Sequence, residues 1–77
     1  MNRKDFIDIL QERIEQETRF VKKLNQTYEK TDIYFSESKI PDQGILMIKS
    51  SILGVVKSCE NYIKTLELIL KEFKKGR

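Results

Sequence analysis

The chain has 77 residues, a net charge of +3, one cysteine and no histidine. A chain of this length forms one domain at most and has a small core, and its composition excludes an internal disulfide and a zinc site built from histidine and several cysteines. With 35% charged and 39% hydrophobic residues but only three glycines and one proline, it has the profile of a helical domain. We therefore predict one all-α domain over residues 1–77 that gains stability from oligomerisation or from a partner.

The first predicted helix covers about residues 3–30. Asn2 is a suitable N-cap, and Asp5 follows it three residues later in the position that completes a capping pair. Apolar residues then recur with the heptad spacing of a helix that packs along one side, and Phe6 and Phe20 widen this stripe. The stripe consists of Ile7, Leu10, Ile14, Val21, Leu24 and Tyr28, and it is interrupted by a single charged residue, Glu17.

Residues 31–41 break the heptad pattern and are predicted to form the loop. They include Asp32, Ser36, Ser38 and the only proline, Pro41, whose preceding residue is disfavoured in the α conformation. Ile33, Tyr34 and Phe35 also fall in this segment. We expect them to fold over one end of the core, and the alternative is an exposed anchor for a partner.

The second predicted helix covers about residues 42–75. With Ile45 taken as heptad position a, nine successive a and d positions from Ile45 to Phe73 hold apolar residues or the single cysteine. A further apolar row at position e, formed by Val56, Ile63 and Leu70, makes the stripe wider than one partner helix requires. Lys74 and Lys75 suit the last turn of a helix.

A loop of about ten residues makes the two helices antiparallel neighbours in a hairpin. The surplus apolar residues are Phe6, Phe20, Val56, Ile63 and Leu70. We predict that they contact a second pair of helices, most simply in a homodimer that forms a four-helix bundle, since two-fold dimers are the commonest oligomers. A heterologous protein partner could supply the same helices.

Catalytic groups are scarce in this chain. It has no histidine, no glycine-rich phosphate-binding loop and no cysteine beside a base, so we expect no enzyme, no cofactor and no metal site. Cys59 lies among aliphatic residues, where a thiol acts as a small apolar group, and a redox role is the less favoured alternative. Glu17 has two interpretations, a buried charge that sets the helix register or a carboxylate that reaches water, and the second is favoured because burial of an unpaired charge is costly.

The basic residues are concentrated at the open end of the hairpin. Residues 1–5 and 70–77 carry six basic and two acidic side chains, a net charge of +4, whereas the remainder has a net charge of −1. Such an end could bind nucleic-acid phosphates, an acidic protein surface or anionic lipid, or it could complement the helix dipole and aid solubility. The basic residues are Arg3, Lys4, Lys71, Lys74, Lys75 and Arg77.

The leading functional hypothesis is a non-enzymatic protein-interaction module of the regulator, inhibitor or chaperone type. The alternative is a nucleic-acid-binding regulator that uses the basic end. The repeat pattern is similar to that of helical-hairpin dimers, which include plasmid RNA-binding regulators and small export chaperones, but fold likeness does not define function. We expect a cytoplasmic protein, because no apolar run reaches the roughly 20 residues of a membrane span and the first residues lack a secretory signal.

Overall fold

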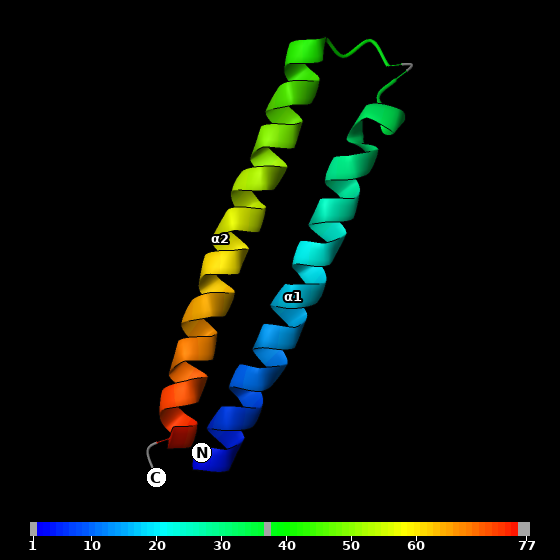
Figure 1. The fold of residues 1–77 in the computed structure, drawn as a ribbon. Coiled ribbons are helices and arrows are strands. Elements are labelled where there is room, and N and C mark those ends of the chain that lie inside the picture. The colour runs from blue at the N-terminus through cyan, green and yellow to red at the C-terminus, as the bar shows by residue number, and fades with distance from the viewer. Residues whose placement is uncertain (1, 37, 76–77) are drawn as a thin grey trace.

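The computed structural model describes residues 2–36 and 38–75, which form two antiparallel α-helices side by side (Figure 1). Helix α1 spans Arg3–Tyr34 and helix α2 spans Asp42–Lys75. The predicted all-α hairpin is confirmed, and the described residues contain no strand. None of the described helices is long and apolar enough to cross a membrane. The molecule is a rod of 58 × 17 × 15 Å, only one pair of helices thick.

Both helix starts follow from local sequence chemistry. The side chain of Asn2 accepts a hydrogen bond of 2.9 Å from the backbone N–H of Asp5, as the capping pair predicts. Helix α2 begins directly after Pro41, whose carbonyl oxygen accepts hydrogen bonds from the N–H groups of Gly44 and Ile45 at 2.8 and 3.2 Å. The predicted bounds of α2 are confirmed.

Helix α1 ends at Tyr34, four residues beyond the predicted end. Residues 31–34 contain neither glycine nor proline, and Thr31 occupies a fully buried position where its hydroxyl donates to the Thr27 carbonyl at 2.8 Å. Helix α1 therefore continues through residues 31–34 and ends where the loop begins. Because Ile33 and Tyr34 lie on the last turn with exposed fractions of 70% and 66%, the expectation that they cover the core is wrong. Phe35, which follows Thr31 by one helical turn, is half-buried.

The contact between the helices uses positions a and e of α2, whereas the heptad pattern predicts positions a and d. The most buried apolar residues are Leu10 on α1 and Val56 and Leu66 on α2. Along α2, positions a and e are turned toward α1, whereas Val55, Tyr62 and Ile69 at position d remain 41%, 41% and 38% exposed. The helix carries three adjacent apolar rows, and a single partner helix covers only two of them.

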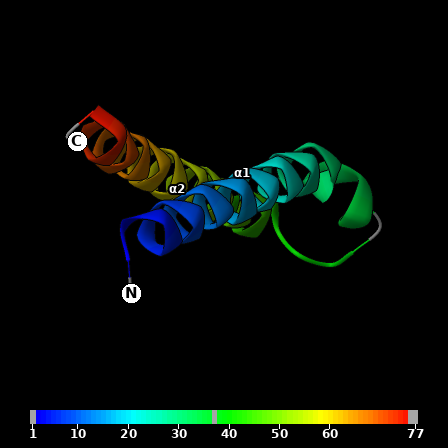
Figure 2. The same ribbon diagram turned by 90° about the horizontal axis from the view of Figure 1, so that it is seen from below.

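Polar and aromatic contacts join the two helices at both ends of the rod. At the open end, the rings of Phe6 and Phe73 lie 4.6 Å apart between centroids, and the Arg3 guanidinium donates to the Phe73 carbonyl. At the loop end, Lys49 Nζ lies 3.0 Å from Asp32 Oδ2 and 5.0 Å from the centroid of the Tyr28 ring. Seen from below, the helices are inclined to one another rather than strictly parallel (Figure 2), as expected when side chains of neighbouring helices interdigitate.

Candidate functional site

Exposed apolar side chains dominate the surface of α2. Among the described residues, three large hydrophobic side chains are buried and twelve are exposed. Seven of the exposed ones lie on α2, and they are Leu46, Met47, Leu53, Val55, Tyr62, Leu68 and Ile69. Single exposed apolar residues are ordinary, but a helix that is apolar on most of its sides is normally buried by several neighbours. The surface of α2 is therefore the first candidate for a functional contact.

The predicted interface residues are divided between this surface and the hairpin contact. Phe6 packs on Phe73, and Val56, Ile63 and Leu70 belong to the rows that face α1. Of that predicted set, Phe20 is exposed. The structure thus leaves apolar side chains of α2 exposed at positions b, c and d, rather than at position e. The signal that could have located them is the distribution of charge around α2, because position e begins with Lys49 whereas position d has no charged residue.

A shallow groove shows how position d is left open. It is lined by Ile9, Leu10, Glu12, Arg13, Gln16, Tyr62 and Leu66, so it follows the contact between the helices along one side. Tyr62 and Leu66 form its α2 wall, and Ile9 supplies an exposed aliphatic side chain from α1. Both residues could contact another helix laid along this side.

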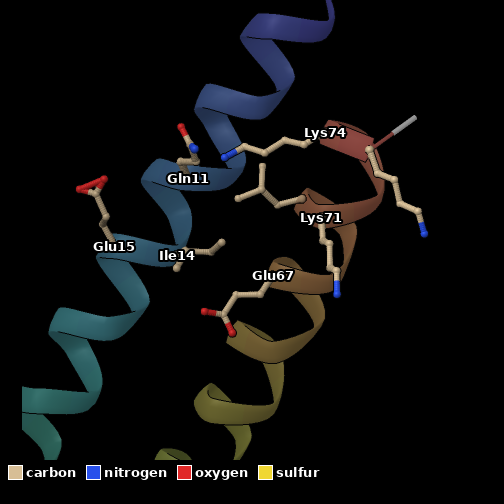
Figure 3. A pocket seen from close by; sticks show the side chains of 8 residues that line it. Gln11, Ile14, Glu15, Glu67, Lys71 and Lys74 are labelled. Carbon is tan, nitrogen blue, oxygen red and sulfur yellow. The ribbon is translucent and has the colours of Figure 1, made fainter. Parts of the chain in front are cut away.

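The opposite side of the hairpin contains the second candidate, an open basic groove of about 930 Å³ near the termini (Figure 3). Lys74 extends from α2 toward α1 near Gln11, and Lys71 and Glu67 lie on the preceding turns. The carboxylates of Glu15 and Glu67 share this groove and lower its net positive charge. The lining residues are Gln11, Ile14, Glu15, Glu67, Leu70, Lys71, Lys74 and Lys75.

The structure brings only part of the predicted basic set into this groove. Lys71, Lys74 and Lys75 line it together, whereas Arg3 is engaged with Phe73, with its guanidinium carbon 5.4 Å from the ring centroid. Lys4 is exposed on the first turn of α1. Arg77 lies outside the described residues. Within residues 2–36 and 38–75, no aromatic residue lines the groove, so this part of the chain offers charge there but no surface on which bases could stack.

Glu17 lies in the contact between the helices and is paired within its own helix. Its carboxylate is 3.4 Å from the Arg13 guanidinium, and only 15% of its side chain is exposed, so the favoured expectation that it reaches water is wrong. Arg13 supplies the positive charge that a largely buried carboxylate requires as a partner. Burial, together with the nearby Glu17 carboxylate, raises the pKa of the Cys59 thiol. A raised pKa keeps the thiol protonated and slow to react.

Among the described residues, no group of three or more histidine, cysteine, aspartate or glutamate side chains is placed to hold a metal ion. Comparison of the chain with models of protein families, with curated proteins and with solved structures finds no match. The two candidate surfaces are therefore judged on their own chemistry.

Proposed function

We propose that this chain is a helical protein-interaction module that presents the exposed apolar side of α2 to helices of another chain. The observation that carries the proposal is the accessible surface of 6130 Å². A compact monomer of 9.2 kDa would expose about 4,900 Å². The hairpin therefore exposes on the order of 1,200 Å² more than a compact fold of its mass, and much of the surface of α2 is apolar.

The module would act without catalysis, as a regulator, an inhibitor or a chaperone does when it binds a partner's helices. In its homodimeric form, two hairpins associate as a bundle of four helices, which covers apolar rows that one hairpin leaves in water. The proposal includes a cytoplasmic location, where a half-buried Cys59 would stay reduced.

Unfolding at different protein concentrations tests the proposal. If the module depends on other helices, its thermal midpoint rises with its own concentration, or with that of an added partner, because association stabilises the folded state by mass action. Light scattering on the same samples reports the mass. A monomer that unfolds cooperatively at one unchanged temperature over an ~100-fold range of concentration, and that binds no hydrophobic dye, would contradict the proposal.

A second candidate function is nucleic-acid binding through the basic groove, which is favoured by the convergence of Lys71, Lys74 and Lys75 on one surface. Contact of these lysines with phosphates predicts an affinity that falls steeply as salt is raised. Replacement of the three lysines by glutamine should abolish binding. The matched control replaces Lys22, Lys23 and Lys57, which removes the same charge elsewhere and should preserve binding. Absence of a mobility shift at low salt would rule out this function.

A further inference from the structure

Three adjacent rows of α2 form a continuous surface without charge. Between Met47 and Ile69, heptad positions c, d and g contain no lysine, arginine, aspartate or glutamate, whereas the five charged residues of this span all fall at b, e and f. We call this surface the neutral face. Its members are Met47, Ile48, Ser51, Gly54, Val55, Ser58, Asn61, Tyr62, Thr65, Leu68 and Ile69.

Apart from half-buried Ile48, the residues of the neutral face are exposed, and the centre of the face points away from the contact with α1. Its centre, position g, lies about a third of a turn around the α2 axis from positions a and e, which face α1. Met47 and Leu68 are 68% and 65% exposed at its outer edge. Along its centre run three small exposed residues, Ser51, Ser58 and Thr65, which would let another helix approach closely. Helices exposed to water normally carry charges on such a surface.

The surplus exposed area of the hairpin as a whole is large enough for contact with a second copy of this chain. A stable interface buries about 800 Å² on each partner, and the hairpin exposes on the order of 1,200 Å² more than a compact monomer of its mass. A face that holds no charge offers nothing to select an acidic or a basic partner. It is complementary to another uncharged face of small and apolar side chains, and its own copy provides one.

The distribution of charge along the rod determines the direction of this pairing. The open end, residues 1–5 and 70–77, has a net charge of +4, whereas residues 29–49 around the loop hold four acidic and three basic side chains. A parallel arrangement would bring two strongly basic ends together. An antiparallel arrangement places each basic end beside the slightly acidic loop end of the other copy, and it also opposes the two helix dipoles.

We propose that the neutral face of α2 binds the same face of a second copy in the antiparallel direction, about a two-fold axis that passes beside Ser58. This inference rests on the proposed interaction function and names its partner. The axis brings Ser58 next to its own copy, Ser51 next to Thr65 of the second copy, and Val55 next to Tyr62 of the second copy. Small residues then meet small residues and apolar residues meet apolar ones, as a self-complementary interface requires.

Cysteine cross-linking in the full chain tests this arrangement. Cys59 is first replaced by alanine, so that each variant carries one thiol. In this background, Ser58→Cys should form a disulfide-linked dimer under mild oxidation, because the two-fold axis brings the two thiols within the short Cα separation that a disulfide needs. Ser51→Cys alone should not cross-link, but a mixture of Ser51→Cys and Thr65→Cys should give the mixed dimer. Glu60→Cys, an exposed position on the opposite side of α2 from Ser58, is the control and should stay monomeric on denaturing gels.

The outcomes separate this inference from the proposed function. Cross-linking of Ser51→Cys to itself would show a parallel pair and overturn the inference. A dimer by light scattering in which Ser58→Cys does not cross-link would also overturn it, while leaving the interaction function in place. A stable monomer whose midpoint is independent of concentration and which binds no hydrophobic dye would overturn both.

Discussion

The ring of Phe6 lies 4.6 Å from the ring of Phe73 between centroids, with the ring planes tilted by 50°. This geometry is favourable for two aromatic rings, and it joins the first turns of α1 to the last turns of α2. The Arg3 guanidinium lies over the same Phe73 ring and donates to the Phe73 carbonyl, one of the carbonyls that the end of a helix leaves without an intrahelical partner. Arg3, Phe6 and Phe73 thus hold the two helices together at the end of the hairpin opposite the loop.

Phe73→Ala should lower the free energy of unfolding by about 2 kcal/mol, less than for a fully buried phenylalanine because Phe73 is half-buried. Urea denaturation at fixed protein concentration measures the change. Phe20→Ala is the matched control, since Phe20 is exposed on the middle of α1, and it should cost less than about 1 kcal/mol. Equal losses for the two variants would show that the aromatic contact does not stabilise the hairpin.

Much of the fold could be predicted from sequence because its signals are local. The Asn2 cap, the helix start after Pro41 and the length of α2 each depend on residues within a few positions of one another. The end of α1 could not be placed in the same way. Thr31 is polar, and only its burial against the other helix shows that it continues the apolar stripe.

The surplus surface was harder to predict because three neighbouring rows of α2 are apolar. The heptad pattern predicts that two rows face α1, but it does not determine which two. The choice depends on the partner helix and on contacts such as the 3.0 Å ion pair of Lys49 with Asp32, which favours turning position e toward α1. Position d is then left in water. Pairing of Glu17 with Arg13 was missed for a similar reason, because a spacing of four residues permits an ion pair without requiring one.

Gly54→Ala should raise the free energy of unfolding by about 0.5–1 kcal/mol, because glycine in a helix interior is less favourable than alanine. A Cβ atom at Gly54 would meet no atom within 4 Å, so the gain in helix propensity has no steric cost. Gly44→Ala is the control. Its Cβ would lie 2.9 Å from Ile40 Cγ2, and the clash should cancel the gain. Thermal unfolding followed by circular dichroism compares the two, and equal changes in midpoint would contradict this difference.

Glu17→Gln should increase the rate at which Cys59 reacts with an alkylating reagent near pH 8. Burial and the Glu17 carboxylate both raise the thiol pKa in the folded state, and the substitution removes the second cause. Because the folded pKa is raised, the associated stability is kept below the ordinary thiol pKa and is lost as pH rises through the raised value. Glu60→Gln, an exposed neighbour in sequence, is the control. Identical pH profiles for Glu17→Gln and the unaltered chain would show that the carboxylate does not act on the thiol.

Charge substitutions at Ser58 should abolish self-association in each single variant, and a mixture of two variants with opposite charges should restore it. Ser58→Arg places two like charges together at the proposed two-fold axis, and Ser58→Glu does the same with the opposite sign, so each variant alone should be monomeric by light scattering. An equimolar mixture brings Arg next to Glu and should restore a dimer that contains one copy of each. Glu60→Lys changes a charge on the far side of α2 from Ser58 and should leave the dimer intact. If Ser58→Arg dimerises as strongly as the unaltered chain, the interface does not pass beside Ser58. If the mixture stays monomeric while each variant remains folded, proximity of the two copies of Ser58 is excluded.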